Sequence, residues 1–249
     1  MPIILKSDDE IAIMREAGRI VAQTLQKLAD ELRPGLVVRE LDKVVRREFE
    51  RHKVVPTFLG YHGYPATVCV SVNEEIVHGI PGKRVIRDGD IVSLDLGCTY
   101  QGFVADSAVT VIVGKTRPLA ERLVDVTRGA LQEGIRHARP GNRLGEISHA
   151  IEEYIAPSGF GVVREYVGHG VGRDMHEEPQ VPNFGPAERG PLLKKGMVLA
   201  LEPMVTAGDW HTKQLADNWT VVTADGSLSA HFEHTIAVTD GDPVVLTAP

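Results

Sequence analysis

The feature that most constrains the fold of this chain is an internal repeat. One helical pattern ends at Arg33-Pro34-Gly35, and another ends at Arg139-Pro140-Gly141, 106 residues further along. The same shift superposes the apolar positions of the helix after each breaker, Ile147, Ile151 and Ile155 on Leu41, Val45 and Phe49. Two amphipathic helices can always be superposed at some offset, but here helix, breaker, helix and strand recur in one order. We therefore expect an α+β domain of two similar halves, roughly residues 7–113 and 118–238, each with two helices packed on an antiparallel sheet.

Local signals place the individual elements. Ser7 and Glu10 form a capping box at the start of the first helix. Asp225-Gly226 is a hairpin turn signal between the last two expected strands. No linker-like segment separates the halves, so we expect them to share one core. Apolar runs and alternation predict strands at residues 66–73, 91–97, 104–113, 198–202, 219–223 and 228–238.

Composition excludes several classes of protein. Lys and Arg number 27 against 34 Asp and Glu, a formal net charge of −7, so a basic nucleic-acid-binding surface is not expected. No apolar run approaches the 18 or so residues of a membrane span. The run Ile3-Ile4-Leu5 is too short for a signal peptide, which predicts a cytoplasmic protein. In that compartment Cys69 and Cys98 are expected to be reduced thiols.

Two carboxylates lie in strands that should be buried. Asp95 interrupts one apolar strand, and Asp106 lies in its expected partner. If the hairpin is centred between Tyr100 and Gln101, the two residues face each other directly, with Cβ atoms roughly 5 Å apart. Buried like charges this close require either a proton shared between them or a cation. The hairpin alone leaves these two interpretations equally open.

The C-terminal half favours the cation. Glu202 ends an apolar strand, Glu233 lies in another strand, and His169 lies in an expected turn between Gly168 and Gly170. Four carboxylates and one imidazole suit a pair of divalent first-row metals better than a tetrahedral structural zinc site. The glycines around His169 do not form a dinucleotide-binding fingerprint.

The motifs around these positions resemble those of the methionine aminopeptidases. They occur in order between about residues 7 and 240, as Gly60-Tyr-His-Gly-Tyr-Pro65, Asn73-Glu-Glu-Ile-Val-His-Gly-Ile-Pro81, Ser93-Leu-Asp-Leu-Gly97, Gly168-His-Gly-Val-Gly172, His176-Glu-Glu-Pro179, Leu201-Glu-Pro-Met204 and Phe232-Glu-His-Thr235. Only 33 residues separate His169 from Glu202, which leaves no room for the helical insertion of type II members. No N-terminal zinc-binding extension precedes the motifs, so the chain resembles the short bacterial form of type I.

The resemblance implies a pita-bread fold and a single catalytic domain over residues 1–249. It implies five ligands for two divalent metal ions, which could be Co²⁺, Mn²⁺, Fe²⁺, Zn²⁺ or Ni²⁺. Asp95 would chelate one metal, His169 and Glu202 would bind the other, and Asp106 and Glu233 would bridge both. In this family the metals activate a water that attacks the first peptide bond, which removes methionine when the second residue is small.

The resemblance also assigns catalytic and substrate-binding residues. Glu202 would carry the proton, His176 would contact the peptide carbonyl, and His78 would lie near the scissile nitrogen. Two pocket residues depart from the common bacterial pattern: Phe58 replaces a frequent Cys, and Met175 replaces a frequent Phe. The implied substrate-binding residues are His78, His176, Tyr61, Tyr64, Cys69, Phe58, Met175 and Trp219.

The implied partners are the N-termini of nascent polypeptides, which the enzyme would bind at the ribosome. The resemblance also implies that the enzyme is a monomer. Two other functions are compatible with the fold. Proline-specific peptidases of this fold usually carry an extra N-terminal domain, whereas this chain starts directly at the catalytic helix. Metal-free pita-bread proteins that only bind peptides lose one or more ligands, whereas all five are present here.

Overall fold

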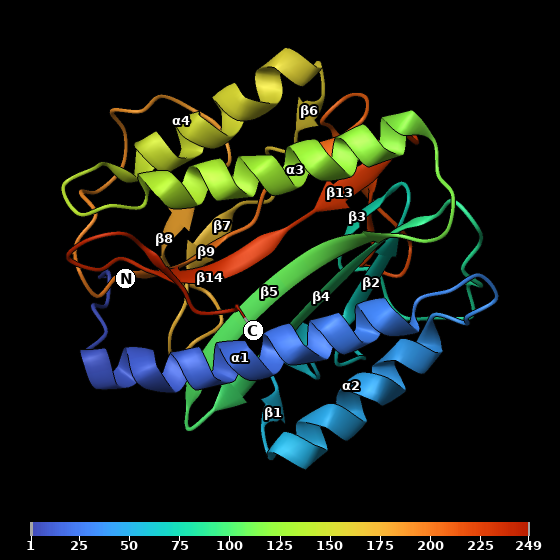
Figure 1. Ribbon diagram of the computed structural model, residues 1–249, viewed down its shortest axis with the longest axis horizontal. Helices are drawn as coiled ribbons and strands as arrows, with labels where there is room; N and C mark the ends of the chain where they lie inside the picture. The colour runs from blue at the N-terminus through green and yellow to red at the C-terminus, as the bar shows by residue number, and fades with distance from the viewer. Residues whose placement is uncertain (1, 249) are drawn as a thin grey trace.

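The computed structural model describes residues 2–248. Its α-helices form two successive pairs, α1 (Asp8–Glu31) with α2 (Arg39–His52) and α3 (Pro118–His137) with α4 (Leu144–Ile155). In Figure 1 the first pair covers the lower half of a curved sheet and the second pair covers the upper half. The helix order of the predicted repeat is therefore present in the fold.

The main sheet has nine strands in the order β1-β4-β5-β14-β9-β7-β8, with β2 on β4 and β15 on β14, and all of its pairings are antiparallel. Pairing of β5 with β14 joins the two halves. Two three-stranded sheets, β13-β10-β6 and β11-β12-β3, complete the fold. The strands are β1 (Val55–Pro56), β2 (Cys69–Val72), β3 (Glu75–Val77), β4 (Ile91–Tyr100), β5 (Phe103–Ile112), β6 (Gly161–Val162), β7 (Gly168–Gly170), β8 (Glu177–Val181), β9 (Val198–Leu201), β10 (Met204–Thr206), β11 (Thr212–Gln214), β12 (Val221–Thr223), β13 (Ser229–His231), β14 (Glu233–Ala237) and β15 (Val244–Val245).

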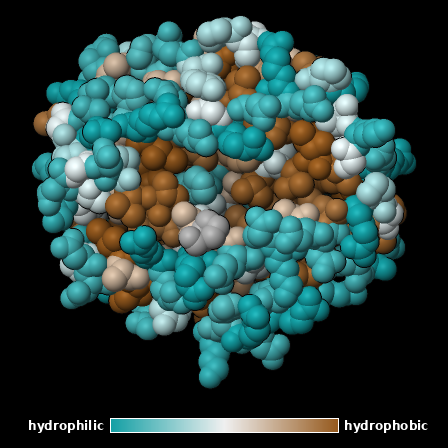
Figure 2. Space-filling model, viewed as in Figure 1, coloured by the Kyte–Doolittle hydropathy of each residue, from teal (hydrophilic) through white to brown (hydrophobic). Residues whose placement is uncertain are grey.

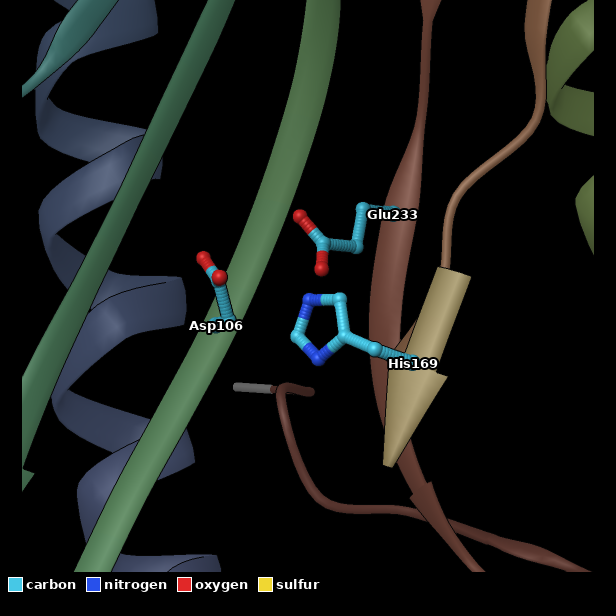
Figure 3. Close-up of side chains that lie close together, drawn as sticks. All are labelled: Asp106, His169 and Glu233. Carbon is cyan, nitrogen blue, oxygen red and sulfur yellow. The ribbon is translucent and has the colours of Figure 1, made fainter. Parts of the chain in front are cut away.

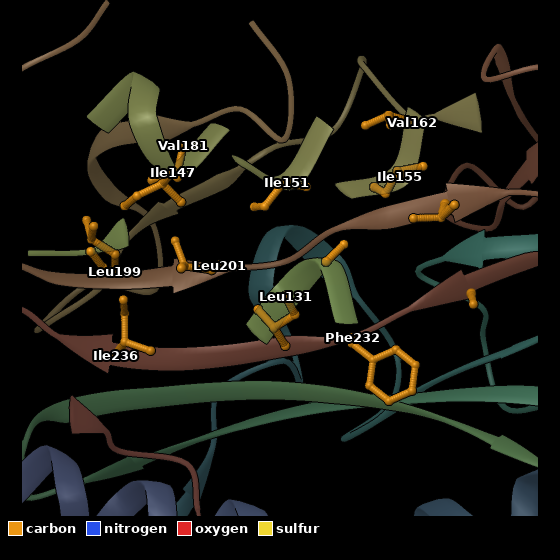
Figure 4. Packing of buried hydrophobic residues seen from close by; sticks show 14 of the residues in the cluster. Leu131, Ile147, Ile151, Ile155, Val162, Val181, Leu199, Leu201, Phe232 and Ile236 are labelled. Carbon is orange, nitrogen blue, oxygen red and sulfur yellow. The ribbon is translucent and has the colours of Figure 1, made fainter. Parts of the chain in front are cut away.

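Each helix pair buries its apolar face against its own half of the sheet. In the C-terminal half, Ile147 and Ile151 of α4 and Leu131 of α3 pack toward Leu199 and Ile236 of the sheet (Figure 4). A second cluster joins α1 and α2 to β2 and β4. Between the helix pairs the surface is hollowed and apolar (Figure 2), over a groove lined by residues of α1, β5 and Phe232. The helices thus cover one face of the sheet.

The capping box is confirmed. The Ser7 hydroxyl accepts a hydrogen bond from the Glu10 amide at 3.2 Å, and the Glu10 carboxylate accepts one from the Ser7 amide at 3.0 Å. α1 ends at Glu31, just before the predicted breaker. Among residues 2–248 we find no helix that is both long and apolar enough to cross a membrane.

The predicted register of the central hairpin is wrong by two residues. Gln101 and Gly102 both have positive φ angles, 48° and 80°, and form a two-residue turn, so Tyr100 pairs with Phe103. As a result Asp106 lies opposite Gly97, and Asp95 lies opposite Ala108. Because the error is an even number of residues, the two carboxylates keep a common face as diagonal neighbours.

The predicted hairpin at Asp225-Gly226 is also wrong, and so is the single strand over 228–238. The chain does turn there, but β12 and β13 belong to different sheets. The expected strand breaks at Phe232, so that β13 pairs with β10 and β14 with β9. Pro203, which separates β9 from β10, has no amide hydrogen to continue the ladder. The interruption in one strand is therefore matched by an interruption in its partner.

Candidate active site

A cavity of about 250 Å³ collects the side chains that the sequence singled out. Leu94 and Leu96 pack in the core formed with α1 and α2. Asp95 between them therefore points to the opposite face of β4, away from the helices. The residues that line the cavity are Phe58, Tyr61, His62, Tyr64, Cys69, His78, Asp95, Asp106, His169, Met175, His176, Glu202, Trp219 and Glu233. Every predicted site residue lies in this one cavity.

Three of the predicted metal ligands converge from three strands (Figure 3). Ligand atoms of Asp106 on β5, His169 on β7 and Glu233 on β14 all lie within 4.8 Å of one another. The His169 Nε2 atom lies 3.6 Å from Glu202 Oε1. The Nδ1 atom of His169 lies 2.9 Å from the carbonyl oxygen of Gly170, to which it can donate a hydrogen bond. That bond leaves Nε2 as a lone-pair donor facing the carboxylates.

His169 lies on a short strand, so its predicted position in a turn is wrong. The glycines on either side explain the difference. A Cβ atom on Gly168 would lie 2.4 Å from the carbonyl oxygen of Ala200, and one on Gly170 would lie 2.3 Å from that of Glu178. Only glycine lets β7 pack this closely between β9 and β8. The Gly-His-Gly pattern thus reflects close backbone packing.

The electrostatics of the acidic residues call for a compensating charge. Burial, followed by the neighbouring carboxylates, raises the pKa values of Asp95, Glu202 and Glu233 well above their ordinary range. Burial raises the pKa of Asp106 to about 7. Oxygen atoms of Asp95, Asp106 and Glu233 are buried without a hydrogen-bond partner among residues 2–248. Buried, unpaired carboxylate oxygens facing one another are suited to hold cations, so this donor set fits divalent metal ions.

Burial favours the uncharged form of three imidazoles in the cavity. Burial, followed by the neighbouring His176, lowers the pKa values of both His169 and His78 to about 4. Burial and the neighbouring His62 lower the pKa of His176 as well. A neutral imidazole has a free nitrogen lone pair, which is the form that can bind a metal. His169 therefore has the protonation state that a ligand needs.

His176 lies at the exposed rim of the cavity, with its ring centroid 4.3 Å from that of His169. The Tyr61 hydroxyl lies 2.6 Å from His176 Nδ1. When the neutral ring accepts this hydrogen bond at Nδ1, its proton is on Nε2. Tyr61 thus fixes His176 as a hydrogen-bond donor through Nε2.

Aromatic rings form the apolar wall of the cavity. The Tyr64 hydroxyl donates to the backbone carbonyls of Val68 and Gly79, which holds its ring edge-on to Trp219 at a centroid distance of 5.0 Å. The Phe58 ring lies edge-on to the same Tyr64 ring, with 6.5 Å between the ring centroids. Cys69 is buried beside them. The wall is therefore apolar and polarisable.

Sequence reasoning missed two histidines. His62 lines the cavity, in a motif that we singled out only for its tyrosines. His231 is 2% exposed, neither of its ring nitrogens has a hydrogen-bond partner among the described residues, and its Nε2 lies 3.8 Å from Glu202 Oε2. Its position two residues before Glu233 was a usable signal, because residues two apart in a strand share a face.

Comparison with known proteins identifies the family. The model for metallopeptidase family M24 matches residues 12–240. Methionine aminopeptidase 1 of Bacillus subtilis is 53% identical over 98% of this chain and 99% of its own length, and the Clostridium acetobutylicum methionine aminopeptidase is 48% identical over 98% of each. The crystal structure of the Thermotoga maritima methionine aminopeptidase superposes with a TM-score of 0.98 at 48% identity, over all of both chains. The pita-bread fold is therefore confirmed, and this chain belongs to the methionine aminopeptidases of metallopeptidase family M24.

Proposed function

We propose that this chain removes the N-terminal methionine from polypeptides whose second residue is small. The observation that carries the proposal is the single cavity in which four buried or nearly buried carboxylates and a neutral imidazole adjoin an apolar aromatic wall. The carboxylates and imidazole supply a place for metal-assisted hydrolysis, and the wall supplies a place for a thioether side chain.

Asp95, Asp106, His169, Glu202 and Glu233 would hold a pair of divalent ions. When bound, such ions supply Lewis-acid polarisation of a carbonyl and lower the pKa of water. The unpaired oxygens of Asp95, Asp106 and Glu233 support this assignment. The donor set, with one imidazole among carboxylates, is compatible with Co²⁺, Mn²⁺, Fe²⁺, Zn²⁺ or Ni²⁺.

Glu202 would carry the proton during hydrolysis. It would accept a proton from the attacking water and deliver it to the leaving amide nitrogen, which balances the reaction. In the metal-free chain, burial and the neighbouring Asp106 raise the pKa of Glu202 well above the ordinary range, so this carboxylate accepts a proton more readily than an exposed one. Its side chain is 15% exposed, so substrate can reach it.

The two other catalytic histidines would act as hydrogen-bond donors. With Nδ1 occupied by Tyr61, the Nε2–H of His176 would donate to the carbonyl oxygen as negative charge develops there. His78 lies edge-on to Trp219 at a centroid distance of 6.3 Å, and would contact the scissile amide nitrogen. Burial favours the neutral imidazole at both positions, and a neutral ring still has one N–H group with which to donate.

The methionine side chain would contact the aromatic wall. Tyr61, Tyr64, Cys69 and Trp219 would surround the thioether, with His78 and His176 at its polar end. Phe58 and Met175 keep the wall apolar where they depart from the common bacterial pattern. We further propose one catalytic domain that acts as a cytoplasmic monomer on nascent chains at the ribosome.

Release of methionine from Met-Ala-Ser, measured together with bound metal, tests the function. We expect release of methionine from Met-Ala-Ser, little release from Met-Arg-Ser, and no cleavage of a Xaa-Pro dipeptide. Chelation should abolish release, and added divalent ions should restore it. Metal-bound protein that cleaves only the Xaa-Pro dipeptide would indicate a proline-specific peptidase. Protein that binds Met-Ala-Ser intact and holds no metal would indicate a binding protein.

A further inference from the structure

A buried ion pair links the N-terminal segment to the loop that carries Met175 and His176. Lys6 is 6% exposed, and its ammonium group contacts the Glu177 carboxylate, whose side chain is 7% exposed. The same ammonium group donates to the carbonyl oxygen of Ile4 at 3.2 Å. The Lys6 amide donates to the carbonyl oxygen of Gly196 at 2.7 Å, which fixes the backbone on which the ammonium group is mounted.

Glu177 in turn closes the loop between β7 and β8. Its Oε1 atom accepts hydrogen bonds from the amides of Arg173 at 2.8 Å and Asp174 at 3.4 Å. Gly172 leaves space for this arrangement, because a Cβ atom there would lie 2.3 Å from Glu177 Oε1 and 2.5 Å from Lys6 Cε. One carboxylate therefore holds both ends of a short loop, with the ammonium group of Lys6 opposite.

We propose that Lys6 is a positioning residue for His176, acting through Glu177. The proposal rests on the proposed function, in which His176 donates a hydrogen bond to the substrate carbonyl. His176 directly precedes Glu177 in the chain, so a shift of the Glu177 carboxylate moves the backbone that carries the imidazole. Lys6 itself does not line the cavity and contacts no residue that we assign to metal binding.

The location of the ion pair is the physical reason for assigning it this role. A buried ion pair contributes little net stability compared with apolar residues of similar volume, because both charges lose their hydration. We therefore assign this pair the role of fixing one geometry of the loop. Removal of the Lys6 charge leaves the Glu177 carboxylate buried without its counter-charge, and that carboxylate then moves toward water. Because a displacement of about 1 Å in a catalytic group can cost up to about a hundredfold in rate, the loop must be held tightly.

A double-mutant cycle on methionine release from Met-Ala-Ser tests the proposal. We expect Lys6→Met to lower kcat about tenfold in the otherwise native enzyme, with bound metal unchanged. In the His176→Ala background the same substitution should change kcat by less than about twofold, because the group that it positions is absent. Lys27→Met is the matched control: it removes the ion pair with the buried Glu48 between α1 and α2, and should leave kcat unchanged.

A second readout does not depend on activity. In Lys6→Met the NMR signals of the His176 ring should shift or broaden, while those of the exposed His211 should stay unchanged. If Lys6→Met does not fold, Lys6→Gln replaces it in the cycle, because it also removes the positive charge but keeps a hydrogen-bond donor at the position of the ammonium group. Equal loss of kcat in both backgrounds, or no loss in a folded variant, overturns the proposal. Native enzyme that releases no methionine would instead overturn the proposed function.

Discussion

Replacement of His176 separates transition-state stabilisation from metal binding. The Nδ1 atom of His176 is occupied by the Tyr61 hydroxyl at 2.6 Å, so its Nε2–H is the atom free to meet the substrate oxygen. A hydrogen bond to an oxygen that gains charge is stronger in the transition state than in the ground state. Loss of one such donor costs about 2.7–4 kcal/mol, or about 10²–10³ in kcat. We therefore expect His176→Ala to lower kcat by that factor, with little change in KM.

The matched variant is His169→Ala. His169 lies seven residues earlier, its Nε2 faces the carboxylates, and its ligand atom lies within 4.8 Å of those of Asp106 and Glu233. We expect His169→Ala to lower metal affinity, whereas His176→Ala should retain its metal. The assay is steady-state release of methionine from Met-Ala-Ser, with metal measured in the same samples.

Tyr61→Phe should reduce kcat by an amount between those of the native enzyme and His176→Ala. Without the Tyr61 hydroxyl, the proton of His176 is free to occupy either ring nitrogen, so only part of the population presents Nε2–H. The loss in kcat should be smaller than about tenfold, corresponding to less than about 1.4 kcal/mol.

Metal loss in His176→Ala with metal retained in His169→Ala would refute the assignment of the two roles.

Three further predictions follow from the same geometry. Glu202→Gln should fold normally but lose more than about tenfold in kcat, because it removes a ligand charge and the proton carrier together; a smaller loss would exclude the proton-carrier role. In the metal-free protein, the raised pKa of Asp106, about 7, means that the folded state holds more protons than the unfolded state between about pH 4 and pH 7. The contribution of Asp106 to the free energy of unfolding should therefore fall as pH rises through that range, by about 1.4 kcal/mol per pH unit, whereas the buried histidines with lowered pKa values act in the opposite direction. Urea denaturation of the metal-free native protein and of Asp106→Asn isolates this contribution, and a contribution that rises with pH would contradict the prediction. Gly168→Ala should destabilise the protein by about 1–3 kcal/mol, because its Cβ would lie 2.4 Å from a carbonyl oxygen of β9, whereas Gly241→Ala, with open space around it, should not.

The repeat and the buried charges were the parts of the sequence from which most could be predicted. The shift of 106 residues predicted the order of the helices, because helix breakers and apolar periodicity are local signals. Asp95 and Asp106 stood out because a charged side chain in an apolar strand needs a partner. These signals do not depend on the register between strands, so the error in the central hairpin did not affect them.

Long-range contacts could not be predicted in the same way. The separation of β13 from β14 depends on Pro203, which lies between β9 and β10 and interrupts a ladder that the local pattern at Phe232 does not reveal. His231 was missed because a single histidine in a strand is usually only a core residue, and its position two residues before Glu233 was not used. Its two unpaired ring nitrogens became evident only after the fold placed Glu202 beside it.

The link between Lys6 and Glu177 illustrates the same limit. The two residues are 171 positions apart. Lys6 follows the apolar run Ile3-Ile4-Leu5 and Glu177 belongs to the motif His176-Glu-Glu-Pro179, but neither local pattern indicates that the two residues are in contact. Only the packing of the N-terminal segment against the loop between β7 and β8 makes them buried partners. A local pattern can therefore identify which residues perform the chemistry, since metal ligands and acid–base groups are unusual in strands. It cannot identify the residues that hold those groups in place, because their side chains become unusual only through burial.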